Sequence, residues 1–200
     1  MKPFTFVLTG NSGCGKGTQG KLLGKYLEEK FSDNPVFYLE TGGRFRKFLS
    51  EPGYSNDLAR KIYEAGERQP DFLGIWNWSH ILIESMIGKE HLIVDGAPRA
   101  YSEALAFETA MKFYGRNLVV IYINVSRAWA KERLMGRGRV DDVNTQRLEH
   151  RLDWFEKDVI PAIEYFRTNP ECRFVEVNGE QTIEEVNAEM MEKLNIRTNE

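Results

Sequence analysis

The decapeptide Gly10-Asn11-Ser12-Gly13-Cys14-Gly15-Lys16-Gly17-Thr18-Gln19 follows directly on an apolar run, Phe4 to Thr9. The spacing Gly-x-x-x-x-Gly-Lys between a strand and a helix is typical of a loop that wraps phosphate groups. Its glycines permit backbone conformations that turn successive N–H groups inward, and the following helix adds the positive end of its dipole. Lys16 supplies a full charge for the β- and γ-phosphates of ATP. The predicted ATP-binding residues here are Gly10, Gly13, Cys14, Gly15, Lys16, Gly17 and Thr18.

Two positions in this loop leave a choice open. Gly17 stands where most such loops carry a Ser or Thr that touches Mg²⁺, and Thr18 comes one place later. The metal would then be held mainly by phosphate oxygens and waters, which Mg²⁺ tolerates. Cys14 lies near Lys16 and a helix N-terminus, surroundings that can make a thiol reactive. The plainer interpretation, which we favour, is that Cys14 is a small residue that fits the loop.

Five short apolar runs predict the strands of a parallel sheet. Several are nearly continuous rather than alternating, as strands are when both faces of a sheet are covered. The runs are Phe4 to Thr9, Val36 to Glu40, His91 to Asp95, Leu118 to Asn124 and Cys172 to Asn178. Helical patterns lie between them, so the sequence predicts an α/β fold, a P-loop NTPase-like three-layer sandwich whose five-stranded parallel sheet is flanked by helices. Ligands in such folds sit beyond the carboxyl ends of the strands.

The longest helical pattern precedes the last strand. Apolar residues recur at steps of three or four from Leu148 to Phe166, with Pro161 inside the run. Proline removes a backbone hydrogen bond and its ring clashes with the preceding turn. We therefore expect a long helix that is bent locally near Pro161.

Composition limits the classes of protein to which the chain can belong. It has 200 residues, 42% of them hydrophobic, and a formal net charge of −3. These values fit a single domain over residues 1–200, with no overall basic field to attract nucleic acid or membrane. Cys14 and Cys172 are too few for a disulfide framework, which fits a reducing compartment. No run approaches the ~20 apolar residues that span a bilayer, so we expect a cytoplasmic protein.

The phosphate-binding loop and four later segments resemble the adenylate kinase family and its UMP/CMP kinase relatives. The segments come in that family's order, and the resemblance covers the chain from Phe4 to about Leu194. They are Thr-Gly-Gly-Arg-Phe-Arg at 41–46 (family pattern Thr-Gly-Asp-x-x-Arg), Gly-Glu-Arg-Gln-Pro at 66–70 (Gly-x-Leu-Val-Pro), Asp-Gly-Ala-Pro-Arg at 95–99 (Asp-Gly-aromatic-Pro-Arg), and the arginine-rich stretch 133–142 with Arg151 (the lid region).

The resemblance implies a short-lid nucleoside monophosphate kinase, and it implies roles for individual residues. The catalytic residues would be Lys16, Arg99, Arg137, Arg139 and Arg151. ATP would also contact Arg133, Arg137 and Gln181. Arg133 would pack over the adenine, and Gln181 would contact it through the backbone. The acceptor monophosphate would be bound by Thr41, Arg46, Gln69, Gly96, Arg99, Glu103, Arg139 and Arg151. Asp95 would order waters on Mg²⁺, the expected cofactor, while Asp141 and Asp142 would orient the arginines.

The same resemblance places the acceptor site on a helical excursion at about 41–70 and a minimal lid at about 136–141. Only Gly138 separates Arg137 from Arg139, so there is no room for a longer lid domain. The chain also lacks a cysteine cluster there, and we expect no zinc.

The chemistry explains why arginines fit this role. The acceptor is itself a phosphate with a second pKa near ~6, so it is already a dianion near neutral pH and needs no general base. Phosphoryl transfer then depends on positioning and on charge neutralisation. Arginine forks bind phosphate bidentately and keep their charge.

The identity of the acceptor base stays open at this stage. Thr41 favours AMP, since UMP/CMP kinases more often have Ala at this position. Glu103 stands where the family has a glutamine, and a carboxylate only accepts hydrogen bonds whereas an amide also donates. We favour AMP and keep three alternatives: a UMP/CMP kinase, another monophosphate kinase with altered base preference, and a non-catalytic ATP-binding switch. We expect a monomer whose partners are ATP and a nucleoside monophosphate, with no nucleic acid or membrane partner.

Overall fold

The computed structural model describes residues 2–136 and 145–196, which contain a five-stranded parallel sheet between two layers of helices. The strands are β1 (Thr5–Thr9), β2 (Val36–Glu40), β3 (His91–Asp95), β4 (Leu118–Asn124) and β5 (Cys172–Asn178). The helices are α1 (Lys16–Lys30), α2 (Thr41–Ser50), α3 (Tyr54–Glu64), α4 (Asp71–Ser85), α5 (Tyr101–Phe113), α6 (Arg127–Gly136), α7 (Thr145–Trp154), α8 (Ile160–Thr168) and α9 (Ile183–Leu194). A π-helical segment, η2 (Phe155–Val159), joins α7 to α8.

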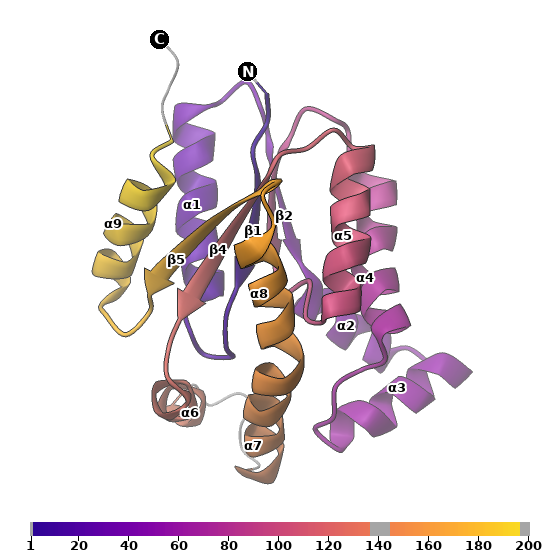
Figure 1. Cartoon of the computed structure of the whole chain (residues 1–200). Helices are drawn as coiled ribbons and strands as arrows, with labels where there is room; N and C mark the ends of the chain where they lie inside the picture. Colours follow the sequence, from indigo (N-terminus) through magenta and orange to yellow (C-terminus); the bar gives the residue numbers. More distant parts are fainter. Residues whose placement is uncertain (1, 137–144, 197–200) are drawn as a thin grey trace.

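The sheet has the strand order β2-β3-β1-β4-β5, with every neighbouring pair parallel. The predicted α/β sandwich is therefore confirmed. Four of the predicted strands have the observed bounds, and the first begins one residue later, at Thr5. Figure 1 shows α2, α3, α6 and α7 gathered at the end of the sheet toward which the strands run. The carboxyl ends of the strands therefore face these helices.

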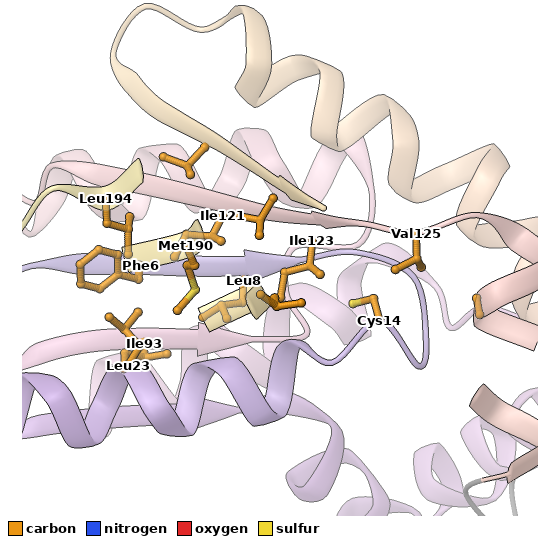
Figure 2. Packing of buried hydrophobic residues seen from close by; sticks show 14 of the residues in the cluster. Phe6, Leu8, Cys14, Leu23, Ile93, Ile121, Ile123, Val125, Met190 and Leu194 are labelled. Carbon is orange, nitrogen blue, oxygen red and sulfur yellow. The ribbon is translucent and has the colours of Figure 1, made fainter. Parts of the chain in front are cut away.

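One face of the sheet is covered by α1 and α9. Leu23 of α1 and Met190 of α9 are fully buried against Phe6, Ile93 and Ile121 of the sheet. Figure 2 shows these side chains filling the space between the strands and α1. Each buried side chain of this size contributes about 1.5–3 kcal/mol by leaving water. This cluster fixes α1, and with it the loop that precedes α1.

The opposite face is covered by α4, α5 and α8. Trp78 of α4 meets Phe107 of α5 edge to face at 5.2 Å between ring centroids, and both lie against Val94 of β3. Phe166 of α8 belongs to the same cluster. Because both faces are covered, the strand residues are apolar almost without interruption, as the sequence indicated.

The predicted long helix before β5 is interrupted rather than regular. The apolar positions from Leu148 to Phe166 are buried as the spacing predicted, but the backbone changes to π-helical geometry at η2. Pro161 follows in the first turn of α8. The irregular turn thus lies just before the proline, which has no N–H to continue the regular hydrogen-bond ladder.

A buried ion pair sits at the end of the sheet opposite the phosphate-binding loop. Arg116 Nη2 lies 2.8 Å from Glu90 Oε1, and both side chains are at most 4% exposed. Arg116 also donates to the carbonyl oxygen of Glu90, whose other carboxylate oxygen accepts the N–H of Ile87. His91 is buried beside this pair, where burial and the Arg116 charge lower its pKa. His91 Nδ1 accepts the N–H of Phe4, so the histidine is structural.

No helix within residues 2–136 and 145–196 combines the length and the apolar character that crossing a bilayer would need.

We expect Arg116→Met to reduce the free energy of unfolding by about 3–5 kcal/mol, because it leaves the Glu90 carboxylate buried without its cation. Urea denaturation of the variant at neutral pH measures the change. Lys25→Met, which removes the cation of the exposed Lys25–Glu29 pair, is the matched control and should change stability by less than about 1 kcal/mol. Equal effects of the two substitutions would contradict this account of the ion pair.

Candidate active site

A single large cleft of about 1230 Å³ lies at the carboxyl ends of the strands, within the part of the chain that the structure describes. Its walls come from the loop after β1, from the start of α2, from the α3–α4 connection and from the turn after β3. Side chains of α6 and α7 and the turn after β5 close its other side. The strand order changes direction beside β1, which is where doubly wound sheets bind ligands.

The loop after β1 supplies unpaired backbone donors to this cleft. Cys14, Thr18 and Gln19 donate their N–H groups to carbonyls within the loop and the first helical turn. Among the described residues, no acceptor faces the N–H groups of Gly13, Gly15, Lys16 or Gly17. The first N–H groups of a helix need such partners, and an anion can provide them.

Close packing explains two of the loop glycines. Gly10 has φ 144°, and a Cβ atom there would lie 2.5 Å from the carbonyl oxygen of Ile123. Gly10 thus lies behind the loop rather than in the cleft wall. Gly13 has φ 86° and approaches the carbonyl oxygen of Ala130 at the start of α6. A side chain at either position would push the loop away from β4 or α6.

Lys16 and Cys14 both turn toward the body of this loop, and the Lys16 ammonium lies 4.0 Å from Cys14 Sγ. The Lys16 ammonium folds back over the loop and donates to the carbonyl oxygens of Asn11 (3.1 Å) and Gly10 (3.3 Å). Cys14 is 4% exposed and belongs to the cluster under α1, where Figure 2 shows it near Ile123 and Val125. The Cys14 side chain therefore fits the loop as a small buried residue, in agreement with the plainer interpretation, and its sulfur packs beside Gly10.

Asp95 ends β3 beside the first turn of α1. Its Oδ2 accepts the phenol hydrogen of Tyr38 at 3.1 Å, and burial followed by the Asp95 charge raises the pKa of Tyr38. The phenol also points at the carbonyl oxygen of Gly17. A Cβ at Gly17 would lie 3.2 Å from Asp95 Oδ2, and one at Gly20 would lie 2.6 Å from the Tyr38 oxygen. The glycines of α1 thus let Tyr38 and Asp95 approach the helix start.

Gly96 brings Arg99 and Thr41 together at the turn after β3. A Cβ at Gly96, whose φ is 88°, would lie 2.8 Å from Arg99 Nη2 and 2.9 Å from Thr41 Oγ1. Thr41 is buried and donates its hydroxyl to the carbonyl oxygen of Asp95. Asn77 of α4 donates to the Thr41 carbonyl at 3.0 Å. Position 96 therefore requires a glycine, because any side chain there would collide with Arg99 and Thr41.

Arg99 is the electrostatic centre of the cleft. Burial lowers the pKa of its guanidinium, and the nearby charges of Arg151 and Arg46 lower that pKa further. The carboxylates of Glu103 and Asp95 act in the opposite direction. Arginine stays protonated in proteins, so several fixed positive charges face one another here. The two carboxylates offset part of this positive charge, and the arginine forks are suited to binding phosphate.

Arg151 reaches the phosphate-binding loop from α7. Its Nη2 lies 3.1 Å from the Ser12 hydroxyl oxygen. An ionic network ties α7 to α6, because Arg127 of α6 contacts both Glu149 and Asp153 at 2.7 Å. Lys131 adds a second contact to Glu149 at 2.6 Å. The network fixes the direction from which Arg151 enters the cleft.

Arg133 and Gln181 lie at the end of the cleft nearest α6 and β5. The Arg133 guanidinium sits 4.9 Å from the ring centroid of Trp129, and both residues line the cleft. Gln181 donates its side-chain amide to the carbonyl oxygen of Asn178 and to Glu189 of α9. Its side chain therefore holds the turn, and the backbone is what it can offer to a ligand.

Arg46 of α2 and Gln69 of the α3–α4 connection line the cleft, and their side chains have different partners. Arg46 is exposed on α2 and pairs with Glu40 at 3.3 Å. Gln69 donates its amide to the carbonyl oxygen of Ala59, which anchors the α3–α4 connection on α3. Gly66 of that connection packs on the backbone of Arg147 in α7, so the excursion touches the helix that carries Arg151.

Glu103 is 4% exposed at the start of α5, yet it lines the cleft. Burial raises the pKa of this carboxyl, while the Arg99 and Arg68 charges lower it. Its Oε2 accepts the N–H of Arg99 at 3.3 Å, and its Oε1 lies 3.9 Å from Arg68 Nη1. Glu103 therefore faces the cleft with a cation beside it, not bulk solvent.

The cleft contains most of the residues that the sequence singled out. Lys16, Thr41, Gln69, Glu103 and Gln181 line it, together with Gly13, Cys14, Gly15, Gly17, Thr18, Arg46, Asp95, Gly96, Arg99, Arg133 and Arg151. Gly10 does not line the cleft, because it packs behind the loop against the backbone of Ile123. Arg137, Arg139, Asp141 and Asp142 lie outside the described residues, as does most of the predicted lid at 136–141.

Sequence reasoning missed several residues of this cleft. Tyr38 sits inside an apolar strand run, where an aromatic residue normally indicates core. Asn77 and Trp129 belong to no conspicuous pattern, and Ser12 lies in the loop after β1 without having been assigned a role. Arg68 lies in the 66–70 segment, but only the fold shows that it faces Glu103.

Comparison with known proteins points in one direction. A family model described as "Adenylate kinase" matches residues 8–171. The chain is 29% identical over 180 residues to an adenylate kinase of Oenococcus oeni, covering 88% of this chain and 91% of that protein. It is 28% identical over 198 residues to an adenylate kinase of Flavobacterium psychrophilum, covering 94% and 97%. It is 27% identical over 185 residues to adenylate kinase 1 of a Nostoc species, covering 92% and 95%.

We expect Gly20→Ala to weaken ATP–Mg²⁺ binding about tenfold, because the new methyl group displaces the Tyr38 phenol and removes its hydrogen bond to the Asp95 carboxylate. Equilibrium titration with ATP, with and without Mg²⁺, measures the effect. Gly24→Ala is the matched control, because a Cβ there meets Ile93 and Val36 only at 3.5–3.7 Å, an ordinary contact. Identical titrations for the two variants would show that Tyr38 does not position Asp95.

Proposed function

This chain belongs to the adenylate kinase family, and we propose that it transfers the γ-phosphoryl group of ATP to AMP, giving two molecules of ADP. The observation that carries the proposal is the convergence of a phosphate-binding loop and separate arginines in one cleft. Arg99 follows β3, Arg151 lies on α7 and Arg46 on α2, and the three interact electrostatically. A simple ATP-binding switch would not need cations on the far side of the loop.

ATP would bind at the loop after β1. The N–H groups of Gly13, Gly15, Lys16 and Gly17 would surround its β-phosphate, and the Lys16 ammonium would leave the loop carbonyls for the phosphate oxygens. The adenine would lie between Arg133 and the turn at Gln181. The Arg133 guanidinium packs on the Trp129 ring, and both residues line this part of the cleft. Arg137 remains part of this proposed site from the sequence alone.

AMP would bind on the opposite side of Asp95 and Arg99. Its phosphate would be held by Arg46, Arg99 and Arg151, which come from three different elements. Its base would lie toward Thr41, Gln69 and Glu103. Gly96 would let the phosphate approach the backbone after β3. Arg139 would complete this set as a prediction from the sequence.

Transfer between the two nucleotides needs no general base, because the acceptor phosphate is already ionised. The attacking oxygen of AMP and the leaving β-phosphate of ATP would be held in line by cations on both sides, with Arg151 between them. The same cations would neutralise the charge on the moving phosphoryl group. The described residues would thus bind, orient and neutralise without forming a covalent bond.

The residues around Asp95 fit Mg²⁺ bound together with ATP. Among the described residues, no group of three His, Cys, Asp or Glu side chains could hold a metal ion alone. Mg²⁺ commonly keeps several waters and binds through one or two carboxylates plus substrate phosphates, and Asp95 offers one such carboxylate. When bound, the ion would supply positive charge to the phosphates. Asp95, oriented by Tyr38, would hold the waters of the ion.

We also propose separate roles for two segments of the chain. The excursion at about 41–70 would carry the acceptor site, and the lid at about 136–141 would close over ATP. The chain would act as a monomer in the cytoplasm.

We expect a coupled assay with ATP–Mg²⁺ to show two ADP formed for each AMP consumed, with AMP preferred over CMP, UMP, GMP and dAMP. Arg99→Met should lower kcat/KM for AMP by roughly 10²–10³, the loss that follows removal of one preorganised charge. Arg173→Met removes an exposed arginine of β5 that donates to the carbonyl oxygen of Lys193, and it should leave kcat/KM unchanged. The proposal fails if folded enzyme forms no ADP with any of these acceptors.

A further inference from the structure

Arg68 and Glu103 place a hydrogen-bond donor next to an acceptor at the AMP end of the cleft. Arg68 comes from the α3–α4 connection and Glu103 from α5, and both line the cleft. Arg68 Nη1 and Glu103 Oε1 are 3.9 Å apart, beyond the range of a direct hydrogen bond. The two groups therefore lie side by side, and each can still bind a third partner.

The Arg68 fork is held in one orientation by two other carboxylates. Its Nη2 lies 2.6 Å from Asp71 Oδ1 at the start of α4, and its Nε lies 3.4 Å from Asp158 Oδ2 in η2. Asp71 is in turn held by the hydroxyl of Ser102. The nitrogen that these contacts leave is Nη1, the one nearest Glu103. A planar guanidinium fixed on two sides presents its remaining donors in a set direction.

The Glu103 carboxylate is fixed in the same way. Its Oε2 accepts the N–H of Arg99, which leaves Oε1 on the side of Arg68. Oε1 lies over Gly74 of α4, where a Cβ would come within 2.7 Å of it. The absence of a side chain at Gly74 is thus what allows the carboxylate to occupy this position. The Glu103 side chain is 6% exposed, so water competes little for its carboxylate.

We propose that Arg68 and Glu103 read the acceptor base as a pair, with Arg68 Nη1 donating to N1 of adenine and Glu103 Oε1 accepting from its 6-amino group. The inference rests on the proposed function, because it concerns the acceptor site of that reaction. It makes Arg68 a specificity-determining residue and gives Glu103 only half of the recognition.

The chemistry of the adenine edge supports the pair over Glu103 alone. N1 of adenine is an acceptor and its neighbouring 6-amino group is a donor, so recognition needs one donor beside one acceptor. An ionised carboxylate supplies acceptors only. A guanidinium supplies donors only, and the two together match the edge. A buried site built from such groups also rejects analogues that leave one of them unpaired.

The test measures kcat/KM for AMP and for 1-deaza-AMP, in which a C–H group replaces N1. For the wild-type enzyme we expect 1-deaza-AMP to be poorer than AMP by about 10- to 100-fold, the loss of one hydrogen bond to a charged group. Arg68→Met should lower kcat/KM for AMP by a similar factor, mainly through KM, and leave 1-deaza-AMP nearly unchanged. The preference for N1 would then almost disappear.

Two further variants separate recognition from a structural role of Arg68. Arg68→Gln keeps an N–H donor and should retain much of the preference for AMP over 1-deaza-AMP. In a Glu103→Gln background the new amide supplies its own donor, so Arg68→Met should cost AMP less than about threefold there. Purine riboside monophosphate, which lacks the 6-amino group, should be poor for the wild type and for Arg68→Met alike. Arg173→Met again serves as the matched control.

The inference is overturned if Arg68→Met leaves the preference for AMP over 1-deaza-AMP at its wild-type value. A uniform loss for both substrates would show that Arg68 only supports the α3–α4 connection. A wild-type enzyme that is inactive with AMP would instead overturn the proposed function, so the two failures are distinguishable.

Discussion

Repulsion between two highly charged nucleotides is the constraint on which the rest of this structure depends. Two phosphate chains must come within bonding distance, so the protein must replace their water with fixed donors and positive charges. The unpaired N–H groups at the start of α1 neutralise one side without adding side chains. In the proposed site Arg46, Arg99 and Arg151 would neutralise the other side, where the Glu103 and Asp95 carboxylates already balance part of the Arg99 charge.

The fold supplies the rigidity that this arrangement requires. Parallel strands deliver Gly10 and Asp95 to the same edge of the sheet, in register through the pairing of β1 with β3. Helices cover both faces, so the strand ends move little relative to one another. The arginines that must approach phosphate come instead from α2, from α7 and from the turn after β3. The ionic network of Arg127 with Glu149 and Asp153 gives α7 a defined direction.

Much of this arrangement could be predicted from the sequence, because its signals are local. The apolar runs predicted the strands to within one residue, and the loop glycines with Lys16 predicted a loop that does line the cleft. Contacts that join distant segments could not be predicted. Tyr38 lies in a strand and looks like core, yet it orients Asp95, 57 residues away. Glu103 comes close to Arg68 only because Gly74 of α4 leaves room for its carboxylate. The sequence predicted a local bend near Pro161 but not the π-helical turn that precedes it.

The most direct test of the central claim is the stereochemistry of transfer at phosphorus. ATP whose γ-phosphorus is made chiral with oxygen isotopes would be incubated with AMP and the enzyme, and the configuration of the β-phosphorus in the ADP formed from AMP would be read out. Direct in-line transfer between two nucleotides held in one cleft predicts inversion of configuration. Retention would mean that a side chain carries the phosphoryl group in between, and it would contradict an account that rests on positioning and charge alone.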